Sequence, residues 1–153
     1  MIRRLVFLGI SALAGPAAAD MATIKLALAD TCIAALPDLT ETHWAFQDMG
    51  WMAFNGGIDE EYQFFSGTTR VFLRALPLAE MPECAVSDAA LSLDAAPGYL
   101  ENVLQSAYPG LWQAGTDRLG RPEWRLQGDE FTAFFRIREG WTGGAEILFE
   151  ARP

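Results

Sequence analysis

The fold is decided by residues 123–152, which read EWRLQGDEFTAFFRIREGWTGGAEILFEAR. Apolar and polar residues alternate in three segments of this stretch with the period of two that is typical of a half-buried strand. These segments are 123–127, 131–139 and 145–152. Gly-rich turn residues separate them, at Gly128-Asp129 and over 140–144. The stretch therefore predicts three antiparallel strands joined as a meander.

The same alternation occurs over 69–76, and a short strand is expected over 83–87, whereas 58–65 fits helix and strand equally well. Helical periodicity marks three other segments, which are 21–36, a short stretch around 38–49, and one that begins at Asp94 with Pro97 in its first turn. Helices followed by strands with short turns predict a single α+β domain. We expect an antiparallel sheet with the helices packed on one of its faces.

Cys32 and Cys84 are the only cysteines. Cys32 lies on the apolar stripe of the helix expected over 21–36, and Cys84 lies on the short strand over 83–87. An even number of cysteines in an exported chain favours a disulfide, which would join the helical layer to the sheet. The alternative is two thiols that are buried separately.

The first nineteen residues have the pattern of a secretory signal peptide, in which a basic start is followed by an apolar run and small residues. Cleavage is expected between Ala19 and Asp20, so that residues 20–153 form the mature domain. An N-terminal membrane anchor is the alternative, but the apolar run is far shorter than the roughly 20 residues that span a bilayer. The expected location is the periplasm or the exterior, with no stable membrane span after cleavage.

The net charge of −9 becomes −11 when Arg3 and Arg4 leave with the signal peptide, because no acidic residue leaves with them. An acidic surface excludes general binding to nucleic acids. His43 is the only histidine, so a zinc site or a catalytic triad has too few ligands or partners, and a structural role for His43 is expected. The acidic run Asp59-Glu60-Glu61 does not have the calcium-loop spacing and is interpreted as a solvated face. The sequence indicates no cofactor, metal site or catalytic residue.

Arginines gather on one predicted face of the sheet. In each strand they alternate with the apolar residues that face the core, so they should share the outer face with aromatic neighbours such as Phe134. The candidate binding face consists of Arg70, Arg74, Arg125, Phe134, Arg136 and Arg138, with Arg152 beside them. Arginine with aromatic neighbours suits recognition of carboxylates, phosphates or protein partners. The alternative is that Glu146 and Glu150 form ordinary cross-strand pairs with these arginines.

Lys25 is the only lysine beside ten arginines, a coding bias that points to a GC-rich bacterium. Together these patterns predict a small exported binding or accessory protein of the bacterial cell envelope, which recognises an anionic ligand or an acidic protein partner without covalent chemistry. Two alternatives stay open. One is an exported hydrolase that works through paired carboxylates, and the other is a non-catalytic structural subunit of an envelope complex. The absence of a catalytic motif favours a protein that is not an enzyme.

Overall fold

The computed structural model describes residues 16–55, 61–74, 81–141 and 143–152. Eight strands in these residues form one antiparallel sheet with the order β1-β2-β3-β4-β8-β7-β6-β5. The strands are β1 (Met52–Asn55), β2 (Glu61–Ser66), β3 (Thr69–Arg74), β4 (Glu83–Asp88), β5 (Trp112–Thr116), β6 (Pro122–Gln127), β7 (Thr132–Glu139) and β8 (Ala145–Arg152). The sheet consists of two four-stranded meanders, which join where β4 pairs with β8. The predicted antiparallel meander over 123–152 is confirmed as β6, β7 and β8.

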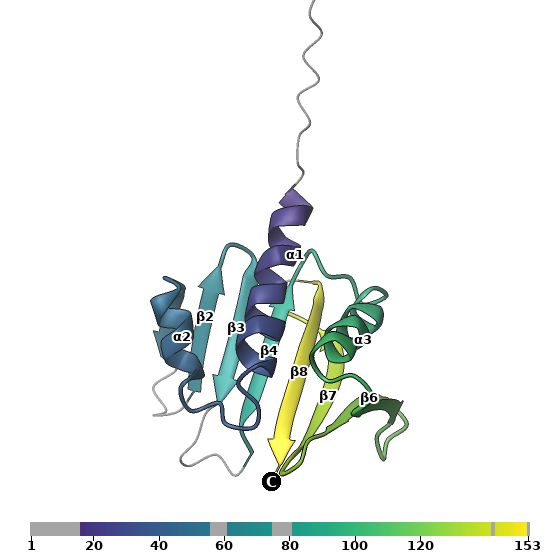
Figure 1. The fold of residues 1–153 in the computed structure, drawn as a ribbon. Coiled ribbons are helices and arrows are strands. Elements are labelled where there is room, and N and C mark those ends of the chain that lie inside the picture. Colours follow the sequence, from purple (N-terminus) through teal and green to yellow (C-terminus); the bar gives the residue numbers. More distant parts are fainter. Residues whose placement is uncertain (1–15, 56–60, 75–80, 142, 153) are drawn as a thin grey trace, which may run out of the picture.

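The helices lie on one face of the sheet, as predicted (Figure 1). They are α1 (Pro16–Ala27), which continues into the π-helical segment η1 (Leu28–Ile33), α2 (Thr42–Asp48) and α3 (Ala96–Ala107). α1 packs against β3 and β4, and α3 packs against β8. The core lies between the two layers, where Leu28 of η1, Leu100 of α3 and Phe149 of β8 are fully buried. None of the described helices has the length and apolar character that crossing a bilayer requires.

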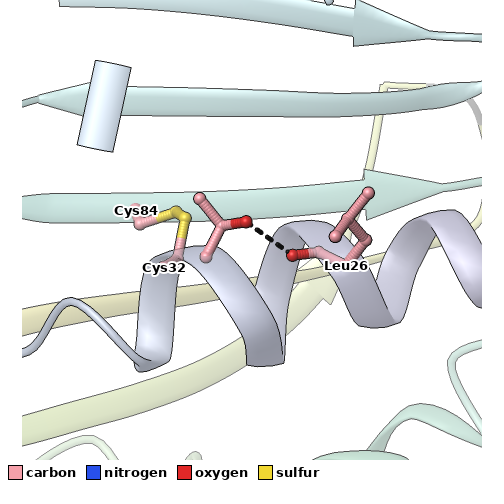
Figure 2. The surroundings of a disulfide bond; sticks show 4 residues. Leu26, Cys32 and Cys84 are labelled. Carbon is pink, nitrogen blue, oxygen red and sulfur yellow. Dashed lines mark hydrogen bonds between the residues drawn. A yellow bond between two sulfur atoms is a disulfide. The ribbon is translucent and has the colours of Figure 1, made fainter. Parts of the chain in front are cut away.

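A disulfide between Cys32 of η1 and Cys84 of β4 fixes the helical layer to the centre of the sheet (Figure 2). The Cα atoms of the two cysteines are 6.3 Å apart, and both side chains are fully buried. Beside the disulfide the hydroxyl of Thr31 donates a hydrogen bond of 2.7 Å to the carbonyl oxygen of Leu26. The predicted bridge is therefore present in the fold.

Several elements differ from the sequence-based expectations. The first helix ends at Ile33 rather than at residue 36, because its last turn widens to a π-helix in which Ala34 N donates to Ala29 O. Asp94 does not cap α3, because the helix begins at Ala96 with Ala95 as its N-cap and no side-chain cap hydrogen bond. The helix expected around 38–49 begins only at Thr42, β1 and β5 were not predicted, and the described part of the ambiguous segment 58–65 belongs to strand β2. Two parts of the expected elements, residues 58–60 and 75–76, lie outside the described residues.

A buried hydroxyl on α3 leads to a stability prediction. Tyr99 Oη is buried and has no hydrogen-bond partner among the described residues, and burial raises the pKa of this phenol to about 12. An unpaired buried hydroxyl costs about 1–3 kcal/mol, so we expect Tyr99→Phe to raise the free energy of unfolding by about 1 kcal/mol. Chemical denaturation measures this change. The matched control is Tyr108→Phe, which removes a hydroxyl that donates to Ile33 O at 3.4 Å and should bring no gain. A less stable Tyr99→Phe protein would contradict the prediction.

Candidate functional site

The sheet face opposite the helices, which we call the open face, carries the arginines that the sequence predicted there. Burial alternates along β3, where Val71 and Leu73 are buried and Arg70 is exposed. In β7 the side chains of Ala133 and Phe135 are buried in the same way. The open face therefore brings together Arg70, Arg74, Arg125, Phe134, Arg136, Arg138 and Arg152.

Four of these arginines form ion pairs with glutamates, three of them across neighbouring strands and Arg152 within its own strand β8. Arg74 binds Glu61 at 2.8 Å and Glu83 at 3.6 Å, and its hydrogen bond to Glu61 is the largest cause that raises the pKa of Arg74. The other pairs are Arg136 with Glu123 at 3.1 Å and Glu150 at 4.0 Å, Arg152 with Glu150 at 3.6 Å, and Arg138 with Glu146. The alternative of cross-strand pairing with Glu146 and Glu150 is thus realised for Arg136 and Arg138 of β7, whereas Arg152 pairs with Glu150 within β8 itself. The pairs with Glu61, Glu83 and Glu123 were not foreseen, because they depend on strand register.

Arg70 and Arg125 form no ion pair with the described residues and contact aromatic rings instead. The guanidinium carbon of Arg70 lies 5.4 Å from the ring centre of Phe65. Arg125 and Arg152 both contact Phe134, at 5.1 and 4.9 Å from its ring centre. A guanidinium on an aromatic face is held in position while its N–H donors stay free for another partner. These two arginines are therefore available for recognition of an anion.

The turn between β5 and β6 borders a depression of about 440 Å³ on the open face, which we call the arginine pocket. Its lining consists of Thr116, Asp117, Arg118, Leu119, Arg121, Glu123, Arg125, Phe134, Arg136 and Arg152. The lining contains five arginines and only two acidic residues, although the chain as a whole is acidic. Arg118 resembles Arg125 in having no ion pair among the residues described. The pocket is therefore a local concentration of positive charge.

Asp117 holds the turn of the arginine pocket in shape. Its carboxylate accepts hydrogen bonds from Leu119 N at 2.8 Å, Arg121 N at 2.9 Å and Arg121 Nε at 2.7 Å. The hydrogen bond from the backbone of Arg121 is the largest cause that lowers the pKa of Asp117 to about 2, so Asp117 stays ionised at neutral pH. Gly120 adopts φ = 77°, a conformation that favours glycine and closes the turn. The pocket wall is thus positioned before a ligand arrives.

The other candidates from the sequence have structural partners or lie outside the described residues. His43 Nδ1 lies 2.8 Å from Thr40 O, and the imidazole stacks on Tyr62 with ring centres 4.9 Å apart. Asp59 and Glu60 are outside the described residues. In the part of the chain that is described, His, Cys, Asp and Glu side chains do not form a group of three or more that could hold a metal ion. The expected cleavage between Ala19 and Asp20 falls within α1 and stays a prediction.

Comparison with known proteins gives no relative. No protein-family model, curated protein or solved structure matches this chain. The functional argument therefore depends on the chemistry of the open face alone.

Proposed function

We propose that this protein is an exported, non-catalytic binding or accessory protein of the bacterial cell envelope, and that it recognises an anionic ligand at the arginine pocket. The observation that carries the proposal is the excess of five arginines over two acids in one depression of an acidic chain. Arginine binds carboxylates and phosphates through two parallel N–H donors, which gives both affinity and geometric selectivity. An anion in the pocket would offset the repulsion among the clustered guanidinium groups.

The rigidity of the pocket supports recognition rather than a weak surface attraction. Arg125 and Arg136 project from paired strands of the sheet, and Asp117 fixes the turn that carries Arg118 and Arg121. Side chains that are ordered before binding lose less conformational entropy when the ligand arrives. Neither Arg118 nor Arg125 would have to break an ion pair with a described residue in order to bind the anion.

The open-face carboxylates favour binding over acid–base hydrolysis. A hydrolase of the rival class needs two carboxylates that converge in a cleft, one of them with a raised pKa. Burial raises the pKa of Glu83, and its partner on the neighbouring strand β8 is Glu150. Both are engaged by arginines, Glu83 by Arg74, and Glu150 by Arg136 and Arg152. Carboxylates held in ion pairs are poorly suited to donate or accept protons.

The disulfide supports the proposed compartment. Structural disulfides form and persist in oxidising environments such as the periplasm and are rare in the cytosol. The bridge between Cys32 and Cys84 thus agrees with the signal peptide that the first nineteen residues predict. Export and a role in the cell envelope remain part of the proposal.

The proposal predicts that charge reversal in the arginine pocket weakens anion binding. We expect the wild-type protein to bind inorganic pyrophosphate in isothermal titration calorimetry at low ionic strength, where surface charges are least screened. The double variant Arg118→Glu/Arg125→Glu should bind about a hundredfold more weakly, because each charge-assisted hydrogen bond contributes roughly 1.5 kcal/mol and 1.4 kcal/mol corresponds to a tenfold change.

Arg70→Glu is the matched control for this experiment. Arg70 also lies on the open face, has no ion pair with a described residue and stacks on a phenylalanine, but it does not line the arginine pocket. Its reversal should leave pyrophosphate affinity within about twofold of the wild type. Equal loss in Arg70→Glu and in the double variant would overturn the pocket as the site. Absence of pyrophosphate binding by the wild type would overturn the pocket as an anion site.

A further inference from the structure

We propose that the open face holds a second binding site, for a uronic acid residue of an acidic saccharide. The site is a groove of about 430 Å³, which we call the Trp141 groove. Strands β2, β3, β4, β7 and β8 and the turn that carries Trp141 line it, through Gln63, Phe65, Arg70, Val71, Phe72, Arg74, Glu83, Ala85, Ser87, Arg138, Trp141 and Glu146. Its lining shares no residue with the arginine pocket, so the inference does not depend on the function proposed above.

The groove follows from small residues on the central strand β4. In the sheet register Ala85 lies between Phe72 of β3 and Leu148 of β8, and Ser87 lies between Arg70 and Glu146. Two short side chains between longer neighbours leave a hollow along β4. Ala85 and Ser87 form its floor and are largely covered by their neighbours, at 2% and 5% exposure, and its walls offer phenylalanine rings and charged groups. A volume of this size lies within the range of small-molecule sites.

Trp141 stands at the rim of the groove on the turn between β7 and β8. The indole is 90% exposed, so it contributes little to the stability of the fold. The turn itself is well anchored, because Gly140 N donates to Gly144 O at 2.7 Å and Gly144 packs directly on the backbone of Asp88. A Cβ atom at Gly144 would lie only 2.0 Å from Asp88 O. An anchored turn that presents an unpacked indole is suited to stacking on the flat face of a ligand.

The one arginine of the groove that has no ion pair with a described residue indicates one carboxylate on the ligand. Three arginines line it, together with two glutamates. Arg74 is paired with Glu61 and Glu83, and Arg138 is paired with Glu146, which leaves Arg70 without an ionic partner among the described residues. A single carboxylate on the ligand would give Arg70 the ionic partner that it lacks.

The ion pairs also favour a hydroxylated ring over an apolar one. Covering an ion pair with an apolar surface removes its water without replacing the lost hydrogen bonds, which is costly. Sugar hydroxyls can both donate to the glutamates and accept from the guanidinium groups, whose five N–H donors exceed what one carboxylate uses. The C–H face of the same sugar ring can pack on Trp141. An acidic sugar therefore satisfies the charge, the ion pairs and the indole together.

The test compares trigalacturonate with the uncharged trisaccharide of galactose, by isothermal titration calorimetry and by tryptophan fluorescence. We expect the wild type to bind trigalacturonate at least tenfold more tightly than the neutral trisaccharide. Trp141→Ala should lose binding of both saccharides. Arg70→Gln should lose the preference for the acid and keep the weak binding of the neutral sugar. Because both side chains are exposed, circular dichroism should show unchanged folding of these variants.

Four outcomes would overturn the inference. One is equal affinity for the acidic and the neutral trisaccharide, and another is unchanged binding in Trp141→Ala. The third is loss of trigalacturonate binding in Arg118→Glu/Arg125→Glu, which would place the saccharide in the arginine pocket instead. Arg118→Glu/Arg125→Glu is the matched control, and it should bind trigalacturonate as the wild type does. The fourth concerns 2-naphthoate, an aromatic acid without hydroxyl groups. If it binds as tightly as trigalacturonate or more tightly, the ligand of the groove is an aromatic acid rather than an acidic sugar, and the assignment is overturned.

Discussion

Replacing Cys32 and Cys84 together by alanine should lower the free energy of unfolding by about 4 kcal/mol. The bridge closes a long loop, since the two cysteines are 52 positions apart in the sequence. Cross-linking a loop of this length restricts the unfolded chain by about 4 kcal/mol in the chain-entropy model, within a general range of roughly 0–5 kcal/mol. For a domain whose total stability is about 5–15 kcal/mol, this is a large share.

Chemical denaturation of three samples separates the bridge from the side chains. The oxidised wild type should be the most stable, whereas the reduced wild type and Cys32→Ala/Cys84→Ala should unfold at similar denaturant concentrations. Alanine is preferred to serine in the variant because both positions are fully buried and a hydroxyl there would have to find a partner. A double variant within about 1 kcal/mol of the oxidised wild type would contradict the prediction.

The bridge also connects stability to the proposed binding groove. Cys84 lies on β4 between Glu83 and Ala85, which line the Trp141 groove on the other face of the sheet. The disulfide therefore fixes the strand that forms the floor of the groove to the helical layer behind it (Figure 2). In a reducing compartment this support would be absent, which is a physical reason to expect the protein to act where disulfides persist.

The gathering of arginines was predictable because it depends only on local alternation. In β3 and β7 the period of two places Val71 and Phe135 in the core, and so places Arg70 and Arg136 on the open face. The fold class followed from the same signal and from the helical stripes. Cys32 was correctly placed in the core because it occupies the stripe of the first helix.

The two depressions could not be predicted, because each depends on pairing between segments that are distant in sequence or weakly patterned. The arginine pocket needs β5, whose sequence Trp-Gln-Ala-Gly-Thr has little apolar alternation and contains a glycine that weakens strand propensity. The Trp141 groove needs β4 beside β8, a pairing that no local turn specifies. Glu61, Glu83 and Glu123 were missed as arginine partners for the same reason, since only the register brings them together.

Phe149→Ala should destabilise the protein by about 4 kcal/mol, the usual magnitude for a fully buried phenylalanine. Phe149 lies on β8, where the two meanders join, with Cys84 opposite it on β4 and Phe135 opposite it on β7. Its ring is fully buried, and its centre lies 5.0 Å from that of Phe135. Truncation would leave a cavity at the junction that holds the sheet together, and the flanking strands cannot close it without breaking their ladders.

Phe54→Ala is the matched control for this truncation, because Phe54 lies on the edge strand β1 and is 62% exposed. It should change the free energy of unfolding by no more than about 0.5 kcal/mol, as is usual for a surface substitution. Thermal or chemical unfolding measures both variants. Similar losses in Phe54→Ala and Phe149→Ala would mean that the β4–β8 junction is no more important than the edge. A large loss confined to Phe149→Ala would identify this junction as a main support of the sheet, and the Trp141 groove depends on it because strands of both meanders line that groove.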